Sequence, residues 1–227
     1  MRKPIIAIDG PAGAGKTTIA RLVAERLGFR YIETGAMYRA AAWQADQLGI
    51  PSTDAERLGA VCASLDLSFE QRDDGPHLLL AGRDITQDVR DPRIGDLASQ
   101  ISVLPQVRGP LVARQRRLAE AGGAVLEGRD IQTVVCPDAD LKVFLTASPE
   151  ERARRRLAQL EEQGRPADLD AVLREVRERD ARDQGRSHSP LRPAPDAVVI
   201  HTDGMAIPEV VERVLSHLPL SDPQSET

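Results

Sequence analysis

The nine residues from Gly10 to Thr18, Gly-Pro-Ala-Gly-Ala-Gly-Lys-Thr-Thr, decide the fold of this chain. Apolar residues at 5–8 ahead of them predict a short buried strand, and apolar residues at helical spacing behind them predict a helix that ends at Gly28. A glycine-rich loop between a strand and a helix can turn its backbone N–H groups toward phosphate oxygens, and the helix N-terminus favours negative charge. The sequence therefore predicts a loop that binds a nucleoside triphosphate. We expect the whole loop to contact ATP: Gly10, Pro11, Ala12, Gly13, Ala14, Gly15, Lys16, Thr17 and Thr18.

Two side chains at the end of this loop carry the chemistry. Lys16 is placed to reach the β- and γ-phosphates, and the Thr17 hydroxyl is placed to ligate Mg²⁺, the metal that we expect to accompany ATP. The alternative is a glycine turn that merely joins a strand to a helix. A lysine and a threonine in the correct register, with both flanks correct, argue against that alternative.

Composition limits the remaining possibilities. The 227 residues are enough for one α/β core with a small insertion. A net charge of −5 and an aromatic content of 3% argue against a nucleic-acid coat or a base-stacking platform, so we expect no nucleic-acid partner. Cys62 and Cys136 have neither metal nor redox spacing, which favours a reduced, cytoplasmic protein. No long apolar run is present, so we expect no signal peptide and no membrane partner. We expect a monomer, because no long exposed apolar stripe is evident in the sequence.

The rest of the chain alternates between short apolar runs and helical patterns, which predicts a parallel sheet flanked by helices. Thr34 is the expected N-cap of a second helix that ends before Gly49. Residues 65–89 interrupt this alternation of strands and helices. Apolar and polar residues alternate at the start of the stretch, as in a half-buried strand, and a turn is expected at Asp73-Asp74-Gly75. A third short strand is expected near Ile85 and Val89. We therefore expect a small antiparallel insertion at 65–89.

Further helices are predicted from their start signals. They begin at Pro92, at Pro105, at a capping box in Ser148–Glu151, after Asp168 and at Pro208. Apolar strands are expected at 124–126, 141–145 and 197–200, and residues 219–227 read as a disordered tail. The strand at 124–126 leads into Glu127-Gly128-Arg129-Asp130, and open α/β sheets place their chemistry after such a strand.

Arginine is dense between 152 and 186. One explanation is a set of helical salt bridges with Glu151, Glu175 and Glu178. The other is a lid that covers phosphates, because the planar guanidinium pairs with two phosphate oxygens at once. We favour the lid, in which Arg179, Asp183 and Arg186 share one face if the helix continues past Gly185. Three further arginines are expected on a solvated face: Arg114, Arg116 and Arg117.

Three classes of phosphate-binding protein compete. A GTPase needs Asn-Lys-x-Asp to read guanine, and the chain has no such motif. A motor or transport ATPase needs an apolar strand that ends in an acidic residue, which Ala124–Glu127 matches only loosely. The third class is a small phosphotransferase, in which an acceptor region and an arginine lid close over both substrates and exclude water. The chain length, the insertion and the arginines favour this class.

Four motifs together resemble bacterial cytidylate kinase, a member of the nucleoside monophosphate kinase family of P-loop proteins. They are Gly10–Thr18, Glu33–Arg39, Gly128–Ile131 with Thr133–Val135, and Arg179 through Arg186. The resemblance runs from about Ile5 to Leu218 and implies a parallel five-stranded core. It implies a core at 1–33, 103–150 and 187–218, a monophosphate-binding region at 34–102 and a lid at 151–186. The implied reaction is the transfer of a phosphoryl group from ATP to CMP or dCMP, with Mg²⁺.

The resemblance also implies residue roles. It implies that Thr34, Arg39 and Arg129 bind the phosphate of CMP, with Tyr38 and Gly128 in the same motifs. It implies that the sugar is bound by Ser99, Arg179 and Asp183. It implies that the base is bound by Arg108, Asp130 and Arg186. Cytosine offers one amino donor and two acceptors, so a carboxylate with cationic donors suits it, whereas uracil reverses part of that pattern. For transition-state charge we expect Lys16 with Arg152 and Arg155.

Two positions depart from the pattern of the family. Gln132 stands where many relatives have glycine, and its side chain is expected to affect how closely this loop approaches the monophosphate. Cys136 stands where an aromatic residue is common and is expected to pack in the core. The remaining alternatives are a kinase of the same fold that acts on UMP, AMP or shikimate, and a nucleotide-binding switch or ATPase that has no acceptor.

Overall fold

The computed structural model describes residues 2–72, 75–162, 164–186 and 189–218. The chain divides into two compact units. The first unit combines Met1–Arg30 with Gly122–Thr227, and the second is Tyr31–Ala121. The turn expected at Asp73-Asp74 and the tail expected beyond 218 lie outside the described residues.

A five-stranded sheet forms the centre of the fold, with the strand order β2-β6-β1-β7-β8. β1 pairs in parallel with β6 and β7, and β7 pairs in parallel with β8. Every residue of β1 is buried, as its unbroken apolar run predicts for a central parallel strand. The strand bounds are β1 Ile5–Asp9, β2 Arg30–Glu33, β6 Ala124–Gly128, β7 Leu141–Thr146 and β8 Val198–His201.

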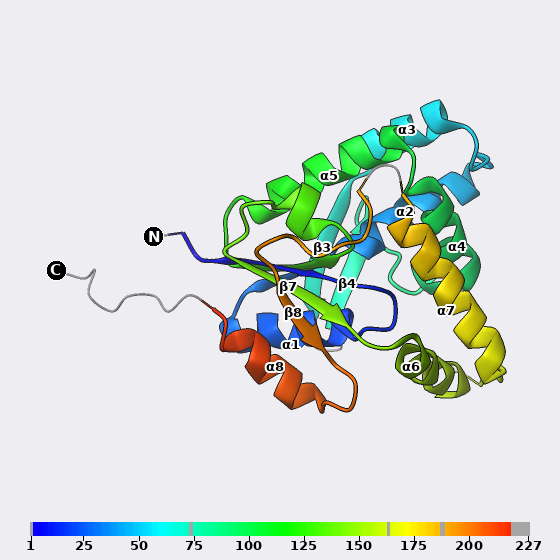
Figure 1. The fold of residues 1–227 in the computed structure, drawn as a ribbon. Helices are drawn as coiled ribbons and strands as arrows, with labels where there is room; N and C mark the ends of the chain where they lie inside the picture. Colours follow the sequence, from blue (N-terminus) through cyan, green and yellow to red (C-terminus); the bar gives the residue numbers. More distant parts are fainter. Residues whose placement is uncertain (1, 73–74, 163, 187–188, 219–227) are drawn as a thin grey trace. The chain divides into compact units, whose positions relative to one another are not determined.

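The first unit also contains two pairs of helices, and the two members of each pair pack against each other (Figure 1). α1 (Lys16–Leu27) packs against β6 and against α8 (Ile207–Leu215). α6 (Pro149–Glu162) and α7 (Leu169–Gln184) pack against each other around a small apolar core of their own. A single π-helical turn, η2 (Ile131–Val135), follows β6.

The second unit is helical, with a small sheet of its own. The apolar faces of its helices enclose one core, to which Met37, Leu58 and Ile101 contribute. Its antiparallel sheet has the order β3-β4-β5 and confirms the predicted insertion. The element bounds are α2 Thr34–Gln47, α3 Ala55–Ser64, β3 Leu67–Arg72, β4 Gly75–Leu80, β5 Arg83–Asp84, η1 Asp88–Arg90, α4 Pro92–Ile101 and α5 Pro105–Ala119.

Three expectations about the second unit are corrected, and one helix was not expected. Helix α3, capped by the Asp54 side chain, was not predicted. Thr34 is the first residue of α2 rather than its N-cap, which is Glu33. The third strand of the insertion is Arg83–Asp84, whereas Val89 lies in the short helix η1. Arg114 is not on a solvated face: it donates hydrogen bonds to the carbonyl oxygens of Leu65 and Leu67.

The predicted capping box at the start of α6 is half present. The hydroxyl of Ser148 accepts a hydrogen bond from the backbone N–H of Glu151, as predicted. The N–H of Ser148 donates instead to the carboxylate of Asp203, which follows β8. Asp168 caps α7 as expected. Across the described part of the chain, no helix combines the length and apolar character that a membrane crossing requires.

Candidate active site

The loop between β1 and α1 requires glycine at positions where another side chain does not fit. Gly10 adopts φ +150°, and a Cβ there would lie 1.9 Å from the carbonyl oxygen of Leu145. Gly13 adopts φ +77°, and a Cβ there would lie 3.1 Å from the Cβ of Arg152. The loop therefore sits tightly between the end of β7 and helix α6. This arrangement holds its backbone N–H groups at the N-terminus of α1.

Lys16 is the first residue of α1, and its side chain is buried. Its ammonium group donates a 2.9 Å hydrogen bond to the carbonyl oxygen of Pro11, so the side chain folds back over the loop. Burial lowers the pKa of Lys16, and the positive charge of Arg129 lowers it further. A bound polyphosphate supplies the negative charge that favours the protonated amine. The loop is thus built for an anion.

Next to this lysine lies a pair of oxygen-bearing side chains that the sequence reasoning did not combine. The hydroxyl of Thr17 donates a 2.9 Å hydrogen bond to the carboxylate of Glu127, the buried residue near the end of β6. Hydroxyl and carboxylate oxygens are the ligand types that Mg²⁺ prefers. The apolar strand Ala124–Leu126 that ends in Glu127 was the available signal. Taken by itself, this strand matches the acidic strand of an ATPase only loosely.

Beyond Glu127, the strand β6 continues into Gly128-Arg129-Asp130. Gly128 pairs in register with Asp9, the residue immediately before the phosphate loop. The carboxyl ends of β1 and β6 are therefore neighbours, as expected for a ligand site in an open α/β sheet. Asp130 is buried beside this point. Burial raises the pKa of Asp9 to about 7, although two backbone N–H groups oppose the rise.

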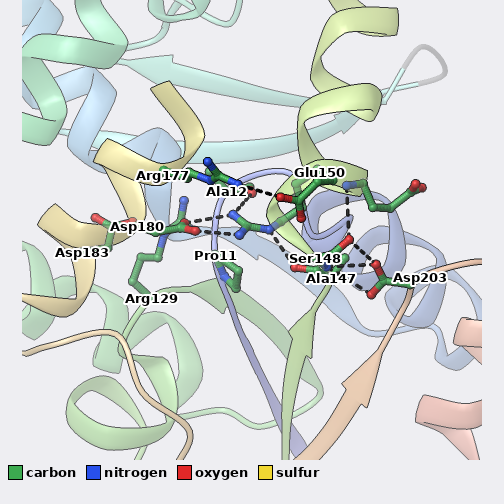
Figure 2. Close-up of polar contacts among 12 residues, drawn as sticks. Pro11, Ala12, Arg129, Ala147, Ser148, Glu150, Arg177, Asp180, Asp183 and Asp203 are labelled. Atoms are coloured by element: carbon green, nitrogen blue, oxygen red, sulfur yellow. Dashed lines mark hydrogen bonds and ion pairs between the residues drawn. The ribbon is translucent and has the colours of Figure 1, made fainter. Parts of the chain in front are cut away.

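An arginine–aspartate cluster joins this loop to α7. Asp183 accepts a hydrogen bond from Arg129 Nε at 3.0 Å and another from Arg186 at 2.5 Å (Figure 2 shows Arg129 and Asp183). Helix α7 ends at Gln184, so it does not continue past Gly185, yet Arg186 still reaches Asp183. Burial alone raises the pKa of Asp183, but the charges of Arg129 and Arg186 outweigh it, and the pKa is lowered. The exposed Arg179 adds positive charge to the same cluster.

The structure places Arg152 between α7, the phosphate loop and the end of β7. Its guanidinium group binds Asp180 through two hydrogen bonds, of 2.9 and 2.6 Å. It also donates to the carbonyl oxygens of Ala12 and Ala147. These three partners approach from different segments (Figure 2). Arg152 is thus held in place by the protein itself.

The other arginines of this region divide between the two explanations considered for them. Arg154 and Arg155 both bond Glu151 within α6, as the salt-bridge explanation expects. Arg155 also donates to the side chain and carbonyl of Thr202. One of its guanidinium nitrogens lies 3.9 Å from the position of a Cβ on Gly15, so it borders the phosphate loop. A further ion pair, between Arg177 of α7 and Glu150 of α6, links these two helices.

The remaining predicted acceptor residues belong to the second unit. Thr34 is buried at the start of α2, and Arg39 forms an ion pair with Glu33. The guanidinium group of Arg108, on α5, lies 5.9 Å from the centre of the Tyr38 ring and donates to the carbonyl oxygen of Ser102. Ser99 lies on α4, three residues before Ser102. The predicted acceptor residues therefore form two groups: one lies in the first unit and the other in the second.

A glycine-rich phosphate loop, a buried lysine at its end, a threonine–carboxylate pair and an arginine-rich helix pair define a P-loop phosphotransferase. The model of the family described as Cytidylate kinase matches residues 6–219. The chain therefore belongs to the cytidylate kinase family, and the resemblance seen in the motifs is confirmed. Its activity is the ATP-dependent phosphorylation of CMP and dCMP.

Individual relatives agree with this assignment. The chain is 48% identical to a cytidylate kinase of Symbiobacterium thermophilum, over 95% of this chain and 96% of that protein. It is 48% identical to a cytidylate kinase of Pseudomonas paraeruginosa, over 94% of each. A solved structure of an uncharacterised protein from Eubacterium ventriosum has a TM-score of 0.52 at 13% identity, covers 95% of this chain and 98% of that one, and supports the fold alone.

Proposed function

We propose that the protein transfers the γ-phosphoryl group of ATP to CMP or dCMP by in-line displacement, with its own residues in the roles given below. The observation that carries this proposal is the position of the Asp183 cluster. The phosphate loop and the loop that carries Arg129 follow neighbouring parallel strands, β1 and β6. Donor phosphates and positive charge for an acceptor are therefore provided at the same edge of one sheet.

ATP is bound by the backbone N–H groups of Gly10–Thr18 and by Lys16. The ammonium of Lys16 exchanges the carbonyl oxygen of Pro11 for the β- and γ-phosphate oxygens, because an anion is a stronger acceptor for a charged donor. No side chain has to act as a nucleophile, since a phosphate oxygen of CMP attacks the γ-phosphorus. The residues align the two phosphates and neutralise the charge that develops between them.

The oxygens of Thr17 and Glu127 fit a magnesium ion. They lie 2.9 Å apart, and one belongs to a carboxylate. The ion, when bound with ATP, neutralises charge on the β- and γ-phosphates. Thr17 provides the predicted ligand, and Glu127 holds the threonine hydroxyl and supplies negative charge for the ion or its water ligands.

CMP is assigned three groups of residues. Thr34, Arg39 and Arg129 are assigned to its phosphate, and Tyr38 and Gly128 lie in the same two motifs. Ser99, Arg179 and Asp183 are assigned to its sugar. Arg108, Asp130 and Arg186 are assigned to cytosine, whose amino group needs the Asp130 carboxylate. The buried state of Asp130 and Arg108 supports this last assignment, because a buried polar group left unpaired by uracil carries a large penalty.

Arg152 and Arg155 are assigned to the charge of the transition state. Arg155 supports this role by its place next to the phosphate loop. Arg152 packs against Gly13 of the loop and reaches a phosphate only by giving up a present partner, of which the Asp180 carboxylate is the natural one to exchange. We also propose that the chain divides, as the family resemblance implies, into a core (1–33, 103–150 and 187–218), a monophosphate-binding region (34–102) and a lid (151–186).

We further propose that the protein works as a monomer in the cytoplasm, without a nucleic-acid or membrane partner. Cys62 and Cys136 are both buried free thiols, which fits a reducing compartment. The test of the whole proposal is product analysis. With ATP, Mg²⁺ and CMP, the protein should form CDP and ADP in equal amounts. ADP formation that proceeds without CDP would contradict it and favour an ATPase.

A further inference from the structure

Two buried polar side chains of the first unit have no role in the proposed binding of either substrate. Asp9 is 0% exposed and Gln132 is 1% exposed. Burying a carboxylate or an amide is unfavourable unless hydrogen bonds compensate for the lost water. The partners of these two side chains therefore indicate what the side chains do.

Asp9 holds the start of η2. One of its carboxylate oxygens accepts the backbone N–H of Ile131 at 3.0 Å, and the other accepts the N–H of Gln132 at 2.9 Å. These are the first two residues of η2, and the initial N–H groups of a helical turn have no partner within the turn itself. Asp9 is also followed directly by Gly10. One residue thus connects the phosphate loop to the loop that carries Arg129 and Asp130.

Gln132 anchors the same loop from its other side. Its amide nitrogen donates a 2.6 Å hydrogen bond to the carbonyl oxygen of Val143, in β7. Its amide oxygen accepts the backbone N–H of Ala194, in the segment between α7 and β8. The side chain therefore points into the interior and does not cover the loop. Both hydrogen-bonding groups of the amide are used.

The two anchored segments lie next to the proposed acceptor residues in the chain. Residues 128–130 precede η2 directly, and the segment of Ala194 follows α7, which carries Arg179 and Asp183. A second link between these segments is the bond from Arg129 to Asp183. We propose that Asp9 and Gln132 are positioning residues for CMP binding. Their buried side chains fix the loop 128–136 against β1 and β7, and this fixes the direction of Arg129 and Asp130. This inference rests on the proposed role of those two residues.

Positioning and plain stabilisation predict different results. If the two side chains only stabilised the fold, their loss would lower the melting temperature and affect ATP and CMP alike. If they position the acceptor loop, their loss raises the KM for CMP selectively, because Gln132 contacts no part of the phosphate loop in its described hydrogen bonds. Local amide exchange separates the two cases further, since loosening of one loop leaves the sheet protected.

The first experiment uses Gln132→Met, which keeps the length of the side chain and removes both hydrogen bonds. We expect the KM for CMP to rise about tenfold, equivalent to ~1.4 kcal/mol, and the KM for ATP to stay within about twofold. The matched control is Gln115→Met, which removes an equally buried glutamine from α5. This control should leave both KM values unchanged. Equal changes in both KM values, or an unchanged KM for CMP in folded Gln132→Met, would overturn the proposal.

A second variant covers the possibility that Gln132→Met folds poorly. Asp9→Asn loses one of two acceptor oxygens, so the amide hydrogens of Ile131 and Gln132 should exchange at least tenfold faster while those of β7 keep their rates. Uniformly faster exchange would contradict positioning. Asp130→Ala, measured in parallel, separates the two proposals. If Asp130→Ala raises the KM for CMP and Gln132→Met does not, the positioning proposal is wrong and the proposed acceptor site is retained. If Asp130→Ala has no effect, the proposed acceptor site fails, and the inference fails with it.

Discussion

Replacing Asp183 by asparagine tests the buried cluster in which one carboxylate holds two arginines. The side chain of Asp183 is 2% exposed, and its partners are Arg129 and Arg186, of which Arg186 is only 9% exposed. Removing one charge from a buried ion pair costs about 3–5 kcal/mol, because the other charge stays buried without compensation. The amide oxygen of asparagine still accepts one hydrogen bond, so we expect a loss of about 3 kcal/mol. In a protein of this size that corresponds to a fall in Tm of roughly 6–12 °C.

The direction of the pKa shift of Asp183 determines how this stabilisation depends on pH. The folded state lowers the pKa of Asp183, because the charges of Arg129 and Arg186 outweigh the effect of burial. The stabilisation is therefore complete above the unfolded pKa of about 3.9 and is lost as the pH falls through the folded value. The difference in Tm between the wild type and Asp183→Asn should be constant from pH 8 to about pH 5 and should shrink below about pH 4.

Thermal denaturation followed by circular dichroism, from pH 3.5 to pH 8, measures this difference. The control is Asp88→Asn, which removes the same charge from an exposed pair with Arg83. That change should lower stability by less than about 1 kcal/mol. If Asp183→Asn melts within about 2 °C of the wild type at pH 7, or if the difference persists unchanged at the lowest pH, the electrostatic account of this cluster is wrong.

Three further predictions concern catalysis. Lys16→Ala should lower kcat by at least ~10² without lowering Tm, because the lost side chain is a buried cation with a lowered pKa; turnover at the wild-type rate would remove Lys16 from the mechanism. Glu127→Gln should raise the Mg²⁺ concentration needed for half-maximal rate about tenfold, whereas the exposed control Glu25→Gln on α1 should not change it; equal Mg²⁺ dependence in both would exclude Glu127. Asp130→Ala should reduce a preference for CMP over UMP of up to ~10⁴, measured as the ratio of kcat/KM values, and an unchanged ratio would exclude Asp130 from base recognition.

Local patterns in the sequence were sufficient for the phosphate loop and for the central sheet. The glycine spacing of residues 10–15, followed by Lys16 and Thr17, predicts a phosphate loop between a strand and a helix, and Gly10 and Gly13 adopt positive φ values. The apolar runs of β1 and β6 predict buried parallel strands for the same local reason. The insertion was predictable because Leu65, Leu67 and Phe69 alternate with polar residues and the chain then reaches a second apolar stretch, Leu78–Leu80.

Features that depend on where a side chain points were missed. Gln132 turns into the interior because the carbonyl oxygen of Val143 and the backbone N–H of Ala194 lie there, and neither is close to it in sequence. Arg114 was expected to be solvated, yet it reaches the carbonyl oxygens of Leu65 and Leu67, almost fifty residues away. Glu127 showed a recognisable signal, but its meaning depends on the 2.9 Å contact with Thr17. Sequence spacing alone does not contain such long-range contacts.

The central claim is tested most directly by coupled measurement of ADP release with ATP and Mg²⁺ over a panel of acceptors: CMP, dCMP, UMP, AMP, GMP and shikimate. We predict strong turnover with CMP and dCMP and, at most, weak turnover with the others, because Arg108, Asp130 and Arg186 are assigned to cytosine. Strong activity with another acceptor would keep the phosphate loop and discard the cytosine site. ADP release that does not depend on any acceptor would contradict the phosphotransferase itself.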